Sequence, residues 1–279
     1  MTASSPPVAR LQLGQLLREL REKSGKTQDA AAEVLECQKP KISKIETGKA
    51  TISAGDVRLL IDLYGANAKT SKTVIQLARE ARKRSPLRVP DWAQRYVALE
   101  SIASAIQSYE TELVPGLMQT EEYTRAAAQA AAPVQGSADP EQMVAVRAER
   151  RARLHNDKSM RFSAVVNEAV LRRCVGGPDV MADQLRHLRE LAELPNITFQ
   201  VIPFSTGAHA AMGASFHFLE IRKPASAKVV YLDGLTSGDY LDGAAAVSQY
   251  SLIFERLRST ATDETGSLDM LEQVIRDLA

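Results

Sequence analysis

The amino-acid sequence predicts a multidomain fold: an all-α domain of about five helices over residues 1–85, followed by an α+β domain over residues 86–279. Three observations predict this division. The 279 residues exceed the usual length of one domain. Apolar residues recur at helical spacing in the first part, whereas β-branched and aromatic runs typical of strands occur only later. Between the two parts, Ser85-Pro-Leu-Arg-Val-Pro90 interrupts the helical pattern.

The first two helices of the N-terminal domain are indicated by spacing and by caps. One apolar face has leucines at positions i, i+3, i+4 and i+7, namely Leu13, Leu16, Leu17 and Leu20. Gly25 stands where the C-terminal cap of this helix is expected. Thr27 is typical of an N-cap, so the second helix is predicted over Gln28 to Leu35.

Three further helices complete this domain. Pro40 stands in the first turn of the third helix, where a proline loses no hydrogen bond. Ile42 and Ile45 are spaced to face a core, and Gly48 ends the helix. The fourth helix is capped by Ser53 and carries the apolar residues Val57, Leu60, Ile61 and Tyr64. The fifth is predicted from about Lys72 to Lys83.

The C-terminal domain is predicted to mix helices and strands. Helices are expected over Trp92–Ser108, Thr120–Ala131, Glu141–Asn156, Pro178–Glu193, Tyr240–Thr260 and Leu268–Leu278, with a loop at Ala132–Pro140. Short runs rich in β-branched and aromatic residues predict strands at Arg161–Val166, Ile197–Ile202, Ser215–Ile221 and Lys228–Leu232.

Charge is distributed unevenly between the two parts. Residues 1–88 carry 17 Lys and Arg against 9 Asp and Glu, a net charge of +8, whereas residues 89–279 carry 18 against 25, a net charge of −7. This asymmetry indicates a module for a polyanion joined to a second domain. Tyr64 is the one aromatic residue in the basic part. Single-stranded nucleic acids are usually held by stacking on aromatic side chains, so the composition favours duplex DNA.

The second and third helices, with the short break between them, predict a helix-turn-helix. An α-helix fits the major groove of DNA, where base edges carry a distinguishable donor and acceptor pattern. Lysines near the start of the third helix would project toward bases, Gln28 would donate to a phosphate, and Lys49 would contact the backbone. The residues predicted to contact DNA are Thr27, Gln28, Gln38, Lys39, Lys41, Ser43, Lys44 and Lys49.

Two segments carry a family resemblance. Thr27-Gln-Asp-Ala-Ala-Ala-Glu-Val-Leu35 and Lys41-Ile-Ser-Lys-Ile-Glu-Thr-Gly48 resemble the TQ…KISRIETG pattern of Xre/Cro-type repressors. The resemblance implies that Glu46 is a structural acid. This sequence departs from the pattern at the turn, where Glu36 replaces the usual glycine and would be strained at a positive φ. Gln38 replaces the usual serine, and Pro40 removes a side-chain donor from the reading face.

Later blocks resemble one subgroup of these regulators. The blocks include Val89-Pro-Asp-Trp92, Ser108-Tyr-Glu-Thr-Glu-Leu-Val-Pro-Gly-Leu-Met-Gln-Thr-Glu-Glu-Tyr123 and Val230-Tyr-Leu-Asp233, with aspartate at the last position in place of the expected glutamate. They are similar to the C-terminal domain of the WhiJ-like group of filamentous, high-GC bacteria. The resemblance implies an antitoxin-like DNA-binding regulator that is often encoded beside a small partner protein.

Several other classes of protein are disfavoured. No apolar stretch approaches the ~18 residues that span a bilayer, and the N-terminus lacks the features of a secretory signal, so a soluble cytoplasmic protein is expected. Cys37 and Cys174 are too few for a disulfide scaffold, and four scattered histidines predict no metal site. The sequence offers no nucleophile–base pair and no phosphate loop, so neither an enzyme nor a cofactor is expected.

Two hypotheses therefore lead, and both include duplex-DNA binding. In the first, the chain is a homodimer whose C-terminal domain binds a small protein encoded by a neighbouring gene. In the second, that domain senses a small molecule. The candidate partner or ligand residues are Tyr109, Glu110, Glu168, Tyr231 and Asp233. An enzyme fused to a DNA-binding module is the third and weakest hypothesis.

Overall fold

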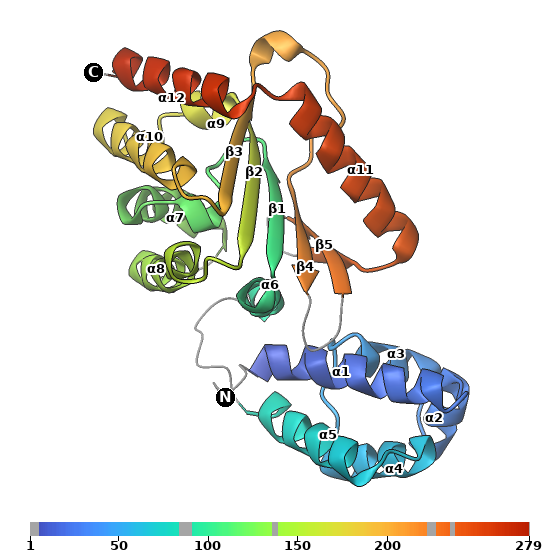
Figure 1. Ribbon diagram of the computed structural model, residues 1–279. Coiled ribbons are helices and arrows are strands. Elements are labelled where there is room, and N and C mark those ends of the chain that lie inside the picture. The colour runs from blue at the N-terminus through green and yellow to red at the C-terminus, as the bar shows by residue number, and fades with distance from the viewer. Residues whose placement is uncertain (1–5, 84–90, 136–138, 222–226, 235–237, 279) are drawn as a thin grey trace. The chain divides into compact units, whose positions relative to one another are not determined.

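The computed structural model describes residues 6–83, 91–135, 139–221, 227–234 and 238–278 (Figure 1). Its contacts divide the chain into two compact units. The first unit contains the five helices of residues 6–81 together with Val97–Ile102, and the second contains a six-stranded sheet with its covering helices. These contents confirm the predicted fold class. The predicted joint at residues 85–90 lies outside the described residues, and the boundary between residues 85 and 86 stays a prediction.

The first unit holds the five predicted helices. They are α1 (Pro6–Lys23), α2 (Gln28–Val34), α3 (Lys39–Glu46), α4 (Ala54–Tyr64) and α5 (Ala68–Ala81). Leu13 and Leu17 are buried in their common core, while Leu16 and Leu20 pack against it partly exposed, which confirms the apolar face of α1. Helix α5 begins four residues before the predicted start, because the side chain of Asn67 caps it by accepting from Thr70 N.

The predicted caps are present in this unit. Thr27 Oγ1 accepts from Ala30 N at 3.1 Å, and Ser53 Oγ accepts from Asp56 N at 3.0 Å. Gly25 follows α1 with a φ of 66°, a conformation that glycine adopts without strain. The ends of these helices are therefore set by local hydrogen bonds, which the capping residues in the sequence predict.

One close approach depends on a glycine inside a helix. A Cβ atom at Gly14 of α1 would lie 2.5 Å from the carbonyl oxygens of Ile45 and Glu46 in α3. Such a contact is far inside the van der Waals separation of carbon and oxygen. Glycine therefore lets α1 and α3 pack backbone against backbone, at the cost of some helix propensity.

The turn between α2 and α3 carries the expected strain. Glu36 has a φ of 48°, and it is the one non-glycine residue with a positive φ among the described residues. Its N–H donates to Glu33 O at 3.0 Å, and the next N–H, of Cys37, donates to Ala32 O at 2.9 Å. These bonds close the end of α2 in the manner of a glycine C-cap. The hydrogen bonds of the turn therefore impose the positive φ, although the residue at this position is a glutamate.

The second unit is built around one mixed sheet in the order β3-β2-β1-β4-β5-β6. Its strands are β1 (Ala105–Glu110), β2 (Arg161–Asn167), β3 (Ile197–Ile202), β4 (Phe216–Ile221), β5 (Ala227–Asp233) and β6 (Gly238–Leu241). Strands β1, β2 and β3 are parallel neighbours, whereas β4, β5 and β6 continue the sheet in antiparallel pairs. The four predicted strands correspond to β2, β3, β4 and β5.

Three predicted elements of this unit were wrong in part. The helix expected over Trp92–Ser108 ends at Ile102 as α6 (Asp91–Ile102), and β1 follows it. Because β1 is the third of six strands and buried on both faces, its residues show no alternation of polar and apolar types. Tyr240 begins no helix but lies in the short edge strand β6, and the loop expected from Ala132 is helical as far as Gln135.

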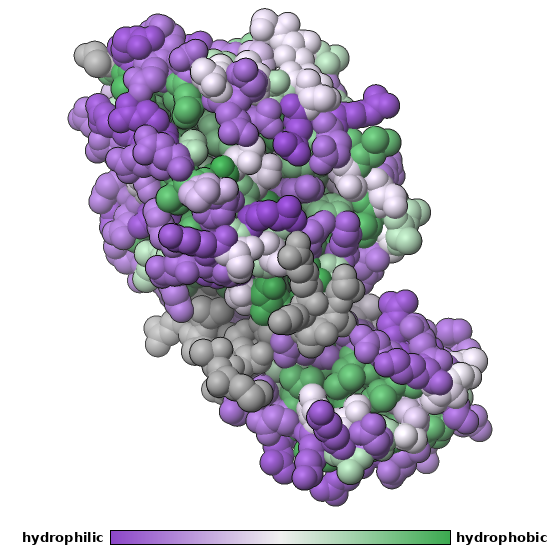
Figure 2. Space-filling view, in the orientation of Figure 1, coloured by the Kyte–Doolittle hydropathy of each residue, from purple (hydrophilic) through white to green (hydrophobic). Residues whose placement is uncertain are grey.

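Helices cover both faces of the sheet (Figure 1). Helices α7 (Glu121–Gln135), α8 (Pro140–Asn156) and α10 (Pro178–Ala192) lie on one face, and α11 (Ala244–Thr260) lies on the other. Helix α12 (Glu264–Leu278) packs on α10 and β3, and the short helix α9 (Ala169–Arg172) follows β2. Phe254 and Leu257 of α11 contact a core of aromatic and aliphatic side chains. Most side chains on the face shown in Figure 2 are hydrophilic.

The strained turn gives a first prediction. Replacing Glu36 by glycine should stabilise the protein by up to about 1 kcal/mol, because glycine reaches a positive φ without a Cβ clash. Part of this gain is offset by the greater freedom of glycine in the unfolded chain. Chemical denaturation of the Glu36→Gly variant measures the change.

The matched control for this substitution is Glu33→Gly in the neighbouring helix. Glu33 is exposed within α2 and has helical geometry, so glycine there should destabilise the protein by about 1 kcal/mol. Destabilisation of comparable size by both substitutions would contradict the assignment of strain to Glu36.

Candidate functional site

Helix α3 presents a polar face and a buried face. Ile42 and Ile45 are 1% and 2% exposed and anchor the helix in the core of the first unit. Lys39, Lys41 and Lys44 are exposed. The helical period of 3.6 residues places Lys44 on the side away from the isoleucines and places Lys39 and Lys41 on the flanks of the buried face, so all three project outward, as the sequence predicts.

A buried hydrogen-bonded acid joins the first three helices. Arg21 of α1 donates from Nε to Glu46 Oε1 at 2.6 Å and from a terminal nitrogen to Glu46 Oε2 at 3.1 Å. Gln28 Nε2 of α2 donates to Glu46 Oε2 at 2.9 Å. The Glu46 side chain is 4% exposed and that of Arg21 is 11% exposed. A two-pronged arginine–carboxylate contact in this setting fixes the orientation of α3 against α1 and α2, which confirms Glu46 as a structural acid.

The first two predicted contact residues have roles within the fold. Thr27 caps α2, and the amide of Gln28 is turned toward Glu46. Gln28 still lies at the N-terminus of α2, where backbone N–H groups and the helix dipole favour an anion. A phosphate contact by these two residues stays a prediction.

The lysines of the α3 face differ in their ionic partners. Lys39 Nζ lies 2.9 Å from Asp29 Oδ2, and Lys41 Nζ lies 3.8 Å from Asp56 Oδ2. Lys44 and Lys49 are exposed and have no carboxylate within ion-pair distance among the described residues. Gln38 is exposed at the N-cap of α3 without a side-chain capping bond, and Ser43 is half-buried. Lys44 and Lys49 are therefore the cations most available to an external anion.

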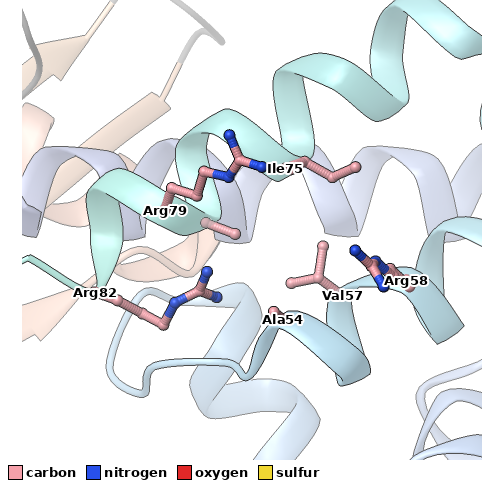
Figure 3. Close-up of a pocket in the computed structure, with 7 residues that line it drawn as sticks. Ala54, Val57, Arg58, Ile75, Arg79 and Arg82 are labelled. Carbon is pink, nitrogen blue, oxygen red and sulfur yellow. The ribbon is translucent and has the colours of Figure 1, made fainter.

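A small cavity lies elsewhere in the same unit, between α4 and α5. It has a volume of about 60 Å³ and is lined by Val57 and Ile75 together with three arginines, Arg58, Arg79 and Arg82 (Figure 3). Arg82 donates to Ile52 O at 3.2 Å. A volume of this size holds water but no drug-sized molecule. The cavity is not a ligand site.

In the second unit, a polar and aromatic cluster lies on the sheet face opposite α11. His217 of β4, Tyr231 of β5 and Tyr240 of β6 are consecutive register partners. The ring of Tyr96 from α6 lies over this row, with centroids 4.5 Å from Tyr231 and 5.2 Å from His217. Glu110 Oε1 of β1 lies 3.4 Å from His217 Nε2. We call these residues, with Asp233 and Arg147, the Glu110 cluster.

Burial shifts the pKa values of two charged residues of the Glu110 cluster. Burial raises the pKa of Glu110 to about 8, although a hydrogen bond with Ser215 opposes the shift. Burial, followed by repulsion from Arg150, lowers the pKa of Arg147 to about 10. Arg147 donates to Gln119 Oε1, and Tyr231 donates to Asp233 Oδ1 at 3.0 Å. The cluster thus holds a protonated carboxyl group near neutral pH, as desolvation favours the uncharged form.

A glycine in the edge strand makes room for the central ring of the cluster. A Cβ atom at Gly238 would lie 2.3 Å from Tyr231 Cε2. Gly238 is the register partner of Asp233, the residue that Tyr231 hydrogen-bonds. The ring of Tyr231 therefore occupies the space that a side chain at position 238 would need.

The structure brings together three of the five candidate residues of this domain, namely Glu110, Tyr231 and Asp233. Tyr109 is adjacent to Glu110 in β1 and so points to the opposite face, where its hydroxyl lies 3.3 Å from His209 Nε2. Glu168, which precedes α9, accepts from Phe204 N at 2.7 Å and pairs with Arg172, the last residue of α9. These contacts indicate a structural role for Glu168, which is not a member of the Glu110 cluster.

Sequence reasoning missed several members of both sites. Arg21 is half of the ion pair in the first unit, and its spacing on α1 carried no signal of a partner on α3. His217 and Tyr96 contact Tyr231, but their proximity depends on strand register and on the packing of α6. Alternation along β4 and β5 places His217 and Tyr231 on the same face, so the register of this hairpin was the missing information.

The buried ion pair gives a second prediction. Glu46→Ala should destabilise the protein by about 3–5 kcal/mol, because Arg21 would stay buried without a counter-charge. The double variant Arg21→Met/Glu46→Leu should recover most of this loss, since no charge is then left unpaired. Denaturant titration measures both.

The control pair is Arg18 and Glu22, which lie 2.9 Å apart on the exposed side of the same helix. Arg18→Ala breaks this pair and leaves the contact of Glu22 with Arg21 in place, so it should cost less than about 1 kcal/mol. Equal losses in Glu46→Ala and Arg18→Ala would show that the Glu46 contact contributes no more than a surface pair.

The Glu110 cluster gives a third prediction, on pH. A glutamate in the unfolded chain ionises near pH 4.5, whereas Glu110 in the folded protein keeps its proton up to about pH 8. The folded state therefore binds more protons between these values, and its stability through this group falls as pH rises from 4.5 to 8. Glu110→Gln should remove this part of the pH dependence and stabilise the protein at pH 8 relative to the parent. Thermal unfolding at a series of pH values tests this, and parallel pH profiles would contradict it.

Comparison with known proteins finds two domain families. Residues 12–70 match a helix-turn-helix domain, and residues 93–273 match a domain of unknown function, DUF5753. Comparisons with curated proteins and with solved structures gave no match. In the described ranges, no helix combines the length and apolar composition that crossing a bilayer requires. The helix-turn-helix match indicates a DNA-binding regulator in preference to an enzyme. Since the second match covers more than half of the sequence, the chain belongs to the DUF5753 family.

Proposed function

We propose that this protein is a sequence-specific regulator of transcription of the Xre/Cro type, which reads duplex DNA with α3. The observation that carries the proposal is the pairing of a helix-turn-helix domain with the exposed lysines of α3. The buried contacts of Glu46 hold that helix at a fixed orientation, which base recognition requires.

The contacts divide into two kinds. Lys44 is exposed on α3 and free of acidic partners among the described residues, so it is the candidate for a guanine edge, whose O6 and N7 accept from lysine. Lys49, beyond the end of the helix, is the candidate for a phosphate, with Thr27 and Gln28 at the start of α2. Gln38, Lys39, Lys41 and Ser43 complete the proposed surface.

We infer that the C-terminal domain regulates this binding without touching DNA. Residues 89–279 have a net charge of −7, which phosphates repel. The resemblance to antitoxin-like regulators supports a small protein partner from a neighbouring gene, and a small-molecule effector is the alternative. A pull-down from native cells distinguishes the two by whether a protein or a low-molecular-weight compound copurifies.

The fourth prediction concerns Lys44. In titrations of the full chain on its target duplex, Lys44→Ala should cost about 1–3 kcal/mol and relax the preference at one base pair. Lys49→Ala should instead weaken binding to all duplexes alike and reduce the slope of log K against log salt by about 1.

The control is Lys72→Ala in α5, an exposed lysine outside the proposed surface, which should leave affinity and salt slope unchanged. If Lys44→Ala weakens all duplexes equally, the residue contacts a phosphate. If neither Lys44→Ala nor Lys49→Ala changes binding, α3 is not the reading helix.

The fifth prediction concerns oligomeric state. We expect a homodimer that covers two half-sites about 34 Å apart, since two-fold symmetric helix-turn-helix proteins bind one turn of DNA apart. Mass measurement in solution and a footprint on the target duplex test this. A monomeric mass with protection of a single half-site would contradict it.

A further inference from the structure

A groove of about 270 Å³ opens on the sheet face that α11 covers elsewhere. It lies at the first residues of β1, β2 and β3 and the last residues of β4, beside the C-terminal part of α11. Val165 and Phe218, further along the same face, pack against Phe254 and Leu257 of α11. The groove is the part of this face that α11 leaves open.

The floor of the groove is a row of polar side chains. Gln107 of β1 is the register partner of Ser163 of β2, and Ser163 is the register partner of Thr198 of β3. Partners in adjacent strands point to the same face and lie side by side. The Oε1 atom of Gln107 and the Oγ atom of Ser163 are buried and have no hydrogen-bond partner among the described residues.

These polar atoms are unfavourable for the free protein. A buried oxygen without a donor loses its hydration and gains nothing in return, whereas an apolar side chain of similar size would pack without loss. The rest of the face shows that the sequence can supply such side chains, as at Val165 and Phe218. A polar row in a hollow of this volume is typical of a surface that hydrogen-bonds a bound molecule.

The rim of the groove carries an excess of positive charge. Arg161 and Arg258 line it, as does Glu220. Glu220 is already neutralised, since Lys228 lies 3.2 Å away and Arg161 lies 3.8 Å away. Among the described residues, the ion-pair partner of the Arg258 guanidinium is Glu255 of its own helix, at 3.7 Å, and the Arg258 side chain is 43% exposed. Arg258 is therefore placed to meet an anionic group above the polar floor.

We propose that this groove binds a small anion that carries several hydroxyl groups, in the class of sugar acids and sugar phosphates. Rotation of the Gln107 amide and of the Ser163 hydroxyl would turn their buried oxygens toward the groove, where hydroxyl groups of the ligand would hydrogen-bond them together with Thr198. The carboxylate or phosphate would meet Arg258. The volume is slightly below that of pockets for drug-sized ligands, which suits a monosaccharide. This proposal does not depend on DNA binding, and it gives the small-molecule alternative a location.

The experiment uses the full chain and four probes: D-gluconate, D-glucose 6-phosphate, D-glucose and inorganic phosphate. We expect at least one of the first two to raise the Tm saturably and to bind in calorimetry. Glucose and phosphate, which each lack one half of the recognised chemistry, should bind about tenfold more weakly or worse. Whichever of D-gluconate and D-glucose 6-phosphate binds more tightly shows whether the site prefers a carboxylate or a phosphate. No saturable binding by either acid would overturn the proposal.

Two substitutions locate the binding. Gln107→Leu should raise the Tm of the ligand-free protein, because it removes an unsatisfied oxygen, and should weaken the acid about tenfold. The matched control is Ser108→Ala: Ser108 Oγ is also buried without a partner but points to the opposite face of β1. It should raise the Tm and leave affinity unchanged. A Tm lowered by Gln107→Leu, with the acid bound as before, would assign the row to ordered water only.

Arg258→Ala should weaken the acid and leave the weak binding of glucose unchanged. Its control is Arg256→Ala, two residues earlier on α11, exposed and outside the groove, which should have no effect on either. Equal effects of both arginine substitutions would mean that the anion responds to overall charge and not to this site. Since the readout is ligand affinity, failure here leaves the DNA titrations unaffected.

Discussion

The first unit depends on the contact between Glu46 and Arg21. A carboxylate with almost no exposure to water is stable only where opposite charge and hydrogen bonds replace its hydration, and here the donors come from α1 and α2. Gly14 lets α1 and α3 approach closely enough for this contact. The outward direction of the lysines on α3 is therefore a consequence of the buried chemistry beneath them. The proposed DNA-reading Lys44 and the buried Glu46 thus lie on different faces of the same helix.

The helices of this unit could be predicted because the signals are local. Thr27 and Ser53 cap helices through atoms three residues away, and Ile42 and Ile45 lie on one face at helical spacing. Strand β1 could not be predicted in the same way. Its residues are buried on both faces, and its partners are 56 or more residues distant, so no nearby pattern marks it. The ends of helices depend on residues close by in the sequence, whereas a central strand depends on neighbouring strands that are distant in the sequence.

The same distinction applies to the sites. The lysines of the proposed reading face follow from helical spacing and from charge. The grouping of Glu110, Tyr231 and Asp233 needed the register of β4 with β5 and the packing of Tyr96, which only the tertiary structure supplies. The floor of the groove is also a matter of register: Gln107, Ser163 and Thr198 are unremarkable in sequence and form a row only when three strands are aligned.

The central position of β1 has a consequence for how the chain matures. Ala105 pairs with Arg161 on one side and with Glu220 on the other, so this strand has no complete set of partners until β4 has left the ribosome. The helices of the first unit contact one another within the first 81 residues, and local contacts of this kind form quickly. During synthesis the N-terminal helices can therefore fold before strands β4, β5 and β6 of the sheet have been synthesised. A ribosome stalled between these points would expose a folded helix-turn-helix unit without its C-terminal domain.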